Sequence, residues 1–453
     1  MTHHFSSVNP SNELLFHTWP ADDDARIERA LDAASALHLR WELEAPSTRV
    51  PLLLRFAEVL EKHNERCASL ATQEMGKPIR EARAELTKCA QAFRYYAEHG
   101  PALLADQTVP GVGFIARAPL GPILAIMPWN FPFWQLFRVA APALLLGNPV
   151  VLKHAENVPG CARMIESLAR EAGAPEGALT TLLVPRERTE SIIKDPRIAA
   201  VTLTGSERAG SAVAAIAGAQ LKPLVLELGG SDPFVVLADA DLSQAVDSAV
   251  RARMQNSGQS CIAGKRFIIE APIYDRFVRL FAERVGGLTC DDPVFESTQV
   301  GPIARADLLE ELEDQVRHSV GFGARVVCGG KRRPGRGFFF EPTVLAEVRP
   351  EHRVFREEVF GPVAAVIRAD DAEHAIALAN DTNYGLGASI WTTQARGLEL
   401  SRQLRAGNVG VNQIVRSDPR APFGGIKRSG FGRELGLDGL LAFANTKTTI
   451  TEG

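Results

Sequence analysis

The sequence has few cysteines, no run of basic residues and no complete glycine-rich dinucleotide fingerprint. Its six cysteines are scattered over 453 residues without a CxxC pair, which excludes a disulfide scaffold and gives no sign of a metal site. This use of cysteine favours the reducing cytoplasm. Fifty basic and 54 acidic residues give a net charge of −4, so a dedicated nucleic-acid binder is not expected.

The segment from Ala118 to Leu152 carries a single charged residue, Arg138, and is the candidate to test as a membrane span. Six prolines interrupt it and leave no clean stretch of about 20 residues for a spanning helix. The residues Met1 to Ser7 have neither a basic region nor an apolar core, so we expect no secretory signal. We interpret the apolar segment as the buried interior of a large soluble protein.

The first hundred residues show the apolar spacing of helices, and short β-branched runs then alternate with helical patterns. Helices are predicted from Ala25 to Glu44, from near Ser47, and from Pro78 to about Glu98. Strands are predicted at 149–153, 181–184, 200–204, 224–228, 233–237, 265–269, 363–367, 387–391 and 408–411. This alternation predicts βαβ units, and so an α/β fold of two doubly wound lobes that meet near Leu228 to Ser231.

The C-terminal stretch from Thr446 to Thr451 alternates like a strand but has no neighbour in the sequence to pair with. We expect its partner to be a strand far away in the sequence, or one from another subunit. An unpaired terminal strand is an edge at which chains associate, so we also expect an oligomer.

Small and flexible residues precede one cysteine, in Asn256-Ser-Gly-Gln-Ser-Cys261. Such a loop lets backbone amides approach whatever a thiolate attacks. A thiol has a reference pKa of about 8.5, so a nucleophilic role also requires a base or a group that lowers the pKa. Two interpretations stay open for Cys261: a catalytic nucleophile, or the inert buried cysteine that most lone cysteines are.

An acid suits the role of base for that thiol better than a histidine does. None of the ten histidines sits in a glycine-rich motif, and the nearest candidate, His154, follows a predicted strand end. Glu227 ends an apolar strand and precedes Gly229-Gly230. A carboxylate in an apolar strand needs a partner or a raised pKa, and a raised pKa suits a general base near neutral pH. Glu227 is therefore either a general base or a structural acid paired with Lys or Arg.

A rigid aromatic turn, Pro128-Trp-Asn-Phe-Pro132, precedes the predicted helix from Phe133 to Leu146. Its two prolines fix the loop, and Asn130 can aim an amide donor at a developing oxyanion. A packed loop without any chemistry would use the same residues.

Other residues favour a nucleotide site although the GxGxxG fingerprint is missing. Thr202-Leu-Thr-Gly-Ser206 ends a predicted strand and opens a helix, whose free N-terminal amides suit a phosphate. Lys153 and Glu156 follow another strand end, where the adenosine ribose lies in a doubly wound sheet. Each signal is weak alone, and together they favour a nucleotide.

Five motifs together make the chain resemble the NAD(P)-dependent aldehyde dehydrogenases over essentially its whole length. They follow one another in the order typical of that family: Pro128-Trp-Asn-Phe-Pro132, Thr204-Gly-Ser206, Glu227-Leu-Gly-Gly230, Gly258-Gln-Ser-Cys261 and Glu357-Glu-Val-Phe-Gly-Pro362. The resemblance implies that Cys261 is the nucleophile and Glu227 the general base. Asn130 would donate a hydrogen bond to the oxyanion, with the backbone amide of Cys261 as second donor.

The resemblance also implies where the cofactor binds. Glu358 and Phe360 would position the nicotinamide ribose and ring. Further residues would lie along the dinucleotide: Trp129, Lys153, Glu156, Gly205 and Ser206. The Glu156 carboxylate can accept hydrogen bonds from ribose hydroxyls and would repel a 2′-phosphate, so we predict NAD over NADP, although Lys153 beside it can attract phosphate.

The implied fold has a Rossmann-like cofactor lobe (1–110 and 120–228), a catalytic lobe (229–435) and a strand-built oligomerisation arm (111–119 and 436–453). The implied assembly is a homodimer or a pair of dimers. The implied reaction is covalent: the aldehyde adds to Cys261 as a thiohemiacetal, loses a hydride to become a thioester, and leaves as the acid after attack by water that Glu227 activates.

Three further stretches resemble the shorter bacterial succinate-semialdehyde dehydrogenases: Leu152-Lys-His-Ala155, Gly230-Ser-Asp-Pro233 and the run from Ser417 to Gly430. His154 stands where most of the family has proline, and this departure itself indicates the subgroup. A buried Arg138 needs an anionic partner. A substrate carboxylate is one candidate, with Ser417 as a second donor, and an internal carboxylate from the other lobe is the alternative.

Alternatives to succinate semialdehyde oxidation stay open at this point. One is a general or aromatic aldehyde dehydrogenase in which Arg138 is structural. Another is an inactive family member that serves as a scaffold, although a scaffold has no need of Cys261, Glu227 and Asn130 together. Coenzyme A could replace water as the acyl acceptor, although Glu227 favours water. Because no cysteine flanks Cys261, a disulfide switch there is not expected.

Overall fold

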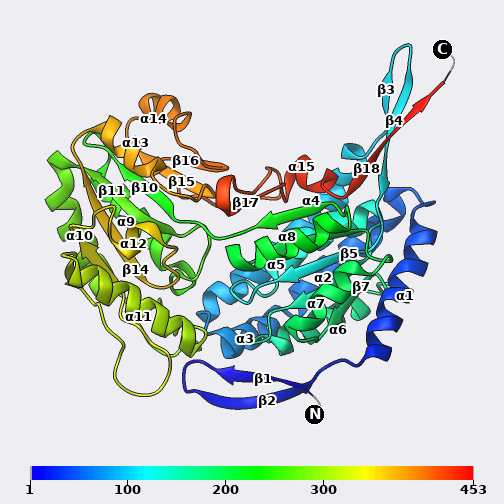
Figure 1. Cartoon of the computed structure of the whole chain (residues 1–453), viewed down its shortest axis with the longest axis horizontal. Helices are drawn as coiled ribbons and strands as arrows, with labels where there is room; N and C mark the ends of the chain where they lie inside the picture. The colour runs from blue at the N-terminus through cyan, green and yellow to red at the C-terminus, as the bar shows by residue number, and fades with distance from the viewer. Residues whose placement is uncertain (1–2, 452–453) are drawn as a thin grey trace.

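The computed structural model describes residues 3–451, which form two open sheets that each carry helices on both faces (Figure 1). Residues 1–2, which open the predicted cofactor lobe and the segment considered as a signal, lie outside the described residues. Residues 452–453 of the predicted arm lie outside them as well. The predicted α/β fold with two doubly wound lobes is confirmed.

The first sheet has the strand order β17-β9-β8-β5-β6-β7, and all strands but β17 run parallel. Its strands are β5 (Ile123–Met127), β6 (Val150–His154), β7 (Leu179–Leu182), β8 (Ala200–Thr204), β9 (Leu224–Glu227) and β17 (Gly430–Phe431). One face packs on α2 (Val50–Lys62), α3 (Asn64–Met75), α4 (Ile79–Leu103), α5 (Trp134–Leu146) and α6 (Pro159–Glu171). The other packs on α1 (Asp24–Trp41), α7 (Thr189–Lys194) and α8 (Glu207–Ala219). The carboxyl ends of its parallel strands therefore gather at one edge, where such sheets bind ligands.

The second sheet has the order β12-β13-β14-β11-β10-β15-β16, with only β12 antiparallel to its neighbour. Its strands are β10 (Asp232–Val236), β11 (Gly264–Glu270), β12 (Arg325–Cys328), β13 (Thr343–Ala346), β14 (Val363–Ala369), β15 (Gly387–Trp391) and β16 (Asn408–Val411). One face packs on α9 (Leu242–Met254) and α10 (Tyr274–Gly286). The other packs on α11 (Ala306–Gly321), α12 (Arg353–Arg356) and α13 (Ala372–Asn380). Two short helices, α14 (Gln394–Ser401) and α15 (Gly436–Leu441), lie beside β16 and α5.

The apolar segment considered as a membrane span forms β5, α5 and β6 in the interior of the first lobe. Every residue of α5 is buried, including Arg138, and so is every residue of β6. This confirms the interpretation of the segment as buried interior. Among residues 3–451, the helices all fall short of the length and apolarity needed to cross a membrane.

An N-terminal hairpin of β1 (His4–Asn9) and β2 (Leu14–Pro20) was not predicted, nor were α3, β12 and β13. The hairpin has no clear apolar alternation, and most of β2 is exposed. It docks through Phe5, which packs on Ala162 and Leu183, and through a polar contact in which Ser7 hydrogen-bonds the buried carboxylate of Glu74. Glu74 in turn accepts the backbone N–H groups of Gly160 and Cys161, both at 2.8 Å, at the start of α6. A tertiary contact of this kind leaves no local signal.

The C-terminal strand β18 (Ala444–Ile450) pairs antiparallel with β4 (Gly113–Pro119), and β3 (Gln107–Val109) pairs with the other edge of β4. These three strands form an arm that projects away from both lobes (Figure 1). At Gly113, where φ is 140°, a Cβ would overlap the carbonyl of Thr449, so the close pairing requires glycine. The prediction of a partner far away in the sequence is confirmed. The partner lies in the same chain, so the expectation of a strand from another subunit is not needed to explain the tail.

The chain passes between the lobes twice. It leaves the first sheet after β9 and enters the second at β10, and later it returns to place β17 beside β9, with Gly430 opposite Glu227. The predicted catalytic segment 229–435 therefore contains, near its end, a two-residue strand of the first sheet, β17. The reason is a long-range antiparallel pairing that strand patterns alone do not reveal.

Candidate active site

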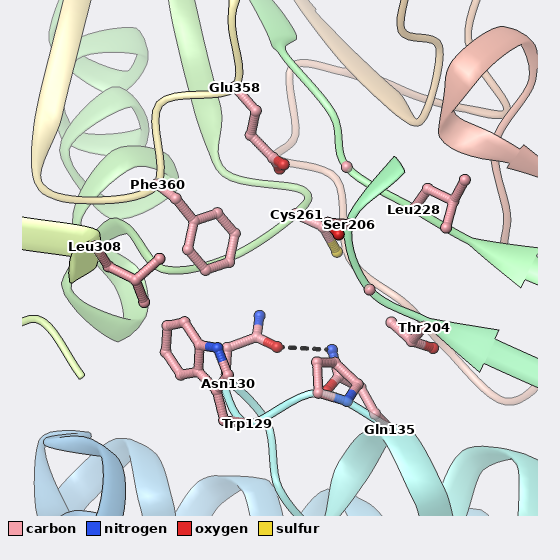
Figure 2. Close-up of a pocket in the computed structure, with 13 residues that line it drawn as sticks. Trp129, Asn130, Gln135, Thr204, Ser206, Leu228, Cys261, Leu308, Glu358 and Phe360 are labelled. Atoms are coloured by element: carbon pink, nitrogen blue, oxygen red, sulfur yellow. Dashed lines mark hydrogen bonds between the residues drawn. The ribbon is translucent and has the colours of Figure 1, made fainter. Parts of the chain in front are cut away.

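A cavity of about 220 Å³ lies between the two lobes (Figure 2). The first lobe lines it with Pro128, Trp129, Asn130, Gln135, Thr204, Gly205, Ser206, Leu228 and Gly229, and the second lobe with Cys261, Leu308, Glu358 and Phe360. The structure thus brings together these sequence-predicted residues: Trp129, Asn130, Gly205, Ser206, Cys261, Glu358 and Phe360. The other predicted residues are not part of this lining: Arg138, Lys153, Glu156, Glu227 and Ser417.

The loop before Cys261 has a strained backbone. Asn256 and Ser257 have φ angles of 53° and 56°, in the left-handed region that residues other than glycine rarely adopt. The side-chain Nδ2 of Asn256 donates to the carbonyls of Asn130 (2.8 Å) and Gln259 (3.0 Å). These hydrogen bonds fix the cysteine loop against the aromatic turn that carries Asn130.

Cys261 is half-buried, and its backbone is fixed by a buried lysine that sequence reasoning missed. Lys265 Nζ donates to the carbonyls of Ser260 (3.0 Å) and Cys261 (2.7 Å). Burial raises the pKa of the Cys261 thiol to about 12, while the charges of Arg138 and Lys265 oppose this rise. The thiol is therefore mostly protonated near neutral pH, and attack by the thiolate requires a group that takes the proton.

Asn130 presents its amide to the cavity in a fixed orientation (Figure 2). Gln135 Nε2 donates to Asn130 Oδ1 at 3.0 Å, so the amide nitrogen points the other way. Nδ2 donates one hydrogen to the carbonyl of Gln259 at 3.0 Å. Because a side-chain amide has two N–H groups, the second can donate to an oxyanion formed on the Cys261 adduct.

His154, the histidine considered from the sequence, supports the aromatic turn. Its Nε2 lies 2.8 Å from the carbonyl of Pro132, and its Nδ1 accepts the backbone N–H of Ala155 at 2.9 Å. Burial lowers the pKa of His154 to about 4, so the ring is neutral and Nε2 donates to Pro132. Both ring nitrogens are engaged, which argues against a cysteine–histidine pair.

Glu227 ends β9 in a buried position directly before Leu228, which lines the cavity. Neither of its carboxylate oxygens has a hydrogen-bond partner among the described residues, so the alternative of a paired structural acid finds no support. Burial raises the pKa of Glu227, the nearby Glu434 raises it further, and Arg138 opposes both effects. A buried, unpaired carboxyl with a raised pKa has the properties of a general base.

Arg138 forms an ion pair with Glu434 in which both side chains are buried, and its Nη2 donates to Thr204 Oγ1 at 3.2 Å. Its guanidinium also lies over the ring of Phe423, 5.3 Å from the centroid. Arg138 therefore has an internal carboxylate as partner, that of Glu434, which was the alternative to a substrate carboxylate. Its identity was missed because the buried arginine predicts an acid but not which one. Nη1 of Arg138 makes no hydrogen bond to the residues within 3–451.

Glu358 and Phe360 face Trp129 across the cavity (Figure 2). Glu358 Oε1 accepts the backbone N–H of Gly230 at 3.0 Å and lies 3.5 Å from Lys265 Nζ. The rings of Trp129 and Phe360 meet edge to face, with centroids 5.7 Å apart. This arrangement gives one end of the cavity a carboxylate beside aromatic walls, which suits a ribose and a planar ring.

The predicted phosphate position lies at the start of α8. Ser206 is the N-cap residue, and its Oγ accepts the backbone N–H of Ala209 at 3.3 Å. Gly205 and Ser206 both line the cavity, so the remaining amides of the first turn of α8 lie close to it. Helix N-terminal amides and the aromatic end together fit a dinucleotide.

Lys153 lies next to the last residue of β6, and Glu156 follows the strand, outside the cavity lining. Lys153 Nζ lies 3.8 Å from the Glu156 carboxylate, which also accepts the backbone N–H of Arg186 at 3.1 Å. Burial lowers the pKa of Lys153. A lysine and a carboxylate thus stand where the adenosine ribose of a bound dinucleotide is expected.

Ser417 is buried in the segment between β16 and β17, where its Oγ accepts a hydrogen bond from Lys88 Nζ at 2.7 Å. Neither Lys88 nor Glu434 was singled out in the sequence. Gln135, Leu228 and Leu308 were also missed, because single polar or apolar residues on helices and strand ends carry no signal of their own.

Comparisons with known proteins agree with this geometry. The aldehyde dehydrogenase family model matches residues 1–449. The chain is 48% identical over 451 residues to the protein of Escherichia coli K12 named succinate semialdehyde dehydrogenase NAD(P)+ Sad, covering 98% of this chain and 97% of that one. It is 46% identical over 453 residues to the succinate-semialdehyde dehydrogenase NADP(+) of Mycobacterium avium strain 104, covering 98% and 96%. The solved structure of succinic semialdehyde dehydrogenase from Streptococcus pyogenes in complex with NADP+ is 34% identical, with a TM-score of 0.97 over 99% of this chain and 100% of that one.

Proposed function

This chain belongs to the aldehyde dehydrogenase family, and on that premise we propose that it oxidises succinate semialdehyde to succinate with NAD(P). The observation that carries the proposal is the shared cavity of Cys261, Asn130, Glu358 and Phe360. The first lobe supplies the amide donor Asn130, and the second lobe supplies the nucleophile, the carboxylate and the aromatic ring (Figure 2). A bound dinucleotide supplies the hydride acceptor in this chemistry.

The Cys261 thiol gives its proton to Glu227, which releases it to solvent before the hydrolytic step. The thiolate attacks the aldehyde carbon, and a carbon–sulfur bond forms as the carbonyl π pair moves to oxygen. Asn130 Nδ2 and the backbone amide of Cys261 donate hydrogen bonds to that oxyanion. Lys265 holds the Cys261 carbonyl at 2.7 Å and so keeps the attacking residue in place. Loss of hydride from the thiohemiacetal leaves a thioester on Cys261.

Glu227 accepts a proton from the water that attacks the thioester, and the thiolate of Cys261 leaves with the carbon–sulfur electron pair. The charge of Arg138 opposes the rise in pKa of both Cys261 and Glu227. Both groups therefore lie close enough to one guanidinium to interact with its charge, which supports this assignment. The Glu227 carboxyl has no hydrogen-bond partner among the described residues, so it can accept the proton of an incoming water.

Succinate semialdehyde is proposed because the relatives described above are named for it and because Arg138 and Ser417 carry donors that suit a carboxylate. Glu434 already balances the charge of Arg138, so burial alone does not require a substrate anion. The proposal for Arg138 rests on its Nη1 group, which can donate to a carboxylate while Nε stays paired.

We expect Arg138→Ala to lower kcat/KM for succinate semialdehyde about tenfold more than kcat/KM for propanal. Both values should fall, since the substitution also leaves the Glu434 carboxyl buried without its partner. Steady-state assays with the two aldehydes separate these effects. Equal losses on both substrates would mean that Arg138 is structural and would favour a general aldehyde dehydrogenase.

The cofactor preference is a second point to test. We propose NAD over NADP, because the half-exposed Glu156 carboxylate repels a 2′-phosphate. The expected result is a higher kcat/KM for NAD, and a ratio that shifts toward NADP by about fivefold in Glu156→Ser, as fits a partly screened charge. Steady-state assays at saturating aldehyde give both numbers. Comparable kcat/KM values for the two cofactors would overturn the preference.

The domains of the chain, the number of copies that assemble and their location are proposals as well. We propose the division into a cofactor lobe (1–110, 120–228), a catalytic lobe (229–435) and an arm (111–119, 436–453), and an assembly of two or four copies in the cytoplasm. The arm supports the assembly, because its three strands project from the lobes and Ile450 at its end is largely exposed.

A further inference from the structure

Lys88 lies half-buried on α4, facing α5 and the segment that carries Ser417. Its Nζ donates to Ser417 Oγ at 2.7 Å and lies 4.2 Å from the centroid of the Trp134 ring. A lysine held between a hydroxyl and an indole face keeps its ammonium group at a defined place.

This ammonium group has no acid as a partner. Within residues 3–451, Lys88 forms no ion pair, and the acids nearest in sequence to Lys88 and Ser417 are occupied. Glu85 pairs with the buried Lys77 and accepts the backbone N–H groups at the start of α5. Asp418 binds Arg420 through two hydrogen bonds of 2.8 and 2.7 Å.

A second cation lies close by. Trp134 and Arg138 are four residues apart on α5, so their side chains share one face of that helix. Burial lowers the pKa of Lys88 to about 8, and the charge of Arg138 contributes to this shift. Arg138 is already paired with Glu434, so among residues 3–451 the ammonium group of Lys88 is the cation left to bind a carboxylate.

We propose that Lys88, together with Ser417, binds the carboxylate at the far end of the aldehyde substrate. Lys88 Nζ retains N–H groups for a carboxylate oxygen, and the Ser417 hydroxyl accepts from Lys88 while its own hydrogen donates to the second oxygen. This inference rests on the proposed function and adds a specificity residue to it. Arg138 adds positive charge from the face of α5 that carries Trp134, and Lys88 selects for an anionic substrate at its distal end.

The test compares kcat/KM for succinate semialdehyde and for butanal, which has the same chain length without the charge, in four proteins: wild type, Lys88→Met, Lys88→Arg and Lys62→Gln. Methionine keeps the apolar stem of Lys88 but removes the charge. Lys62 is an exposed lysine paired with Glu171 on the surface, so its substitution is the matched control. The inhibition constant of succinate against each protein reports carboxylate binding apart from catalysis.

We expect Lys88→Met to lower kcat/KM for succinate semialdehyde at least about tenfold, mainly through KM, and to change butanal oxidation less than about twofold. The inhibition constant of succinate should rise in parallel, and Lys88→Arg should restore most of both. Lys62→Gln should match wild type. If Lys88→Met keeps the wild-type ratio of the two substrates, the role of Lys88 is overturned. If wild type itself does not prefer succinate semialdehyde to butanal, the substrate proposal fails instead.

Discussion

Replacing Cys261 by serine is expected to lower kcat for aldehyde oxidation by about a thousandfold or more. A serine hydroxyl is a far weaker nucleophile than a thiolate, and no histidine stands ready to activate it, since both ring nitrogens of His154 are engaged. The rate of cofactor reduction, followed by absorbance, measures the loss. Mass spectrometry of wild type mixed with aldehyde and dinucleotide should find an acyl adduct on Cys261.

Cys328→Ser is the matched control, because Cys328 is also a half-buried free cysteine but belongs to β12 in the second sheet. It should retain the wild-type rate. Turnover by Cys261→Ser at a rate near wild type, together with an adduct-free Cys261 in wild type, would refute the covalent mechanism. Loss of activity in Cys328→Ser as well would point to a general effect of cysteine replacement on folding.

Replacing Glu227 by glutamine is expected to separate the two halves of the reaction. The thioester should still form, but more slowly, because the thiol proton must then pass to solvent water, so rapid mixing should show a slowed burst of about one reduced cofactor per active site. Steady turnover should then fall by roughly 10²- to 10³-fold, because glutamine cannot take the proton of the attacking water. The substitution removes the repulsion between Glu227 and Glu434, so the melting temperature should not fall.

The pH dependence of wild type follows from the same residue. The base must be ionised, and burial followed by the proximity of Glu434 raises the pKa of Glu227. The steady rate should therefore rise with pH through this raised pKa and fall as pH drops below it. Glu58→Gln, on the exposed face of α2, is the control and should keep both the rate and the pH profile. A Glu227→Gln variant with normal steady turnover would contradict the assignment of the base.

Much of the fold could be predicted from the sequence because the buried parallel strands are short apolar runs separated by helical spacing. β8, β15 and β16 have the predicted bounds, and other strands differ by one or two residues. The N-terminal hairpin escaped prediction, since its contact with Glu74 spans 67 positions and its outer strand faces solvent. Sequence patterns reveal a strand when one whole face of it is apolar and buried. A single buried hydrogen bond produces no such pattern.

The residues of the candidate site also fall into those that the sequence reveals and those that it does not. Cys261, Asn130 and Glu227 stand out because each breaks a local pattern, as a lone cysteine in a flexible loop, an amide between prolines, or an acid in an apolar strand. Glu434 and Lys88 belong to ordinary surroundings. They gain a role only through partners 296 and 329 positions away, Arg138 and Ser417, which the fold alone brings together.

The double crossing between the lobes has a mechanical consequence. Ser429 Oγ donates to the Gly229 carbonyl at 2.6 Å and accepts the N–H of Gly385 at 3.0 Å. One hydroxyl on the chain that returns to the first lobe thus binds the chain that leaves it. Two linked connections between the lobes favour a hinge motion over sliding. Ser429 lies one residue from Gly430, which pairs with Glu227, so we expect the proton acceptor to lie close to the hinge and to move little.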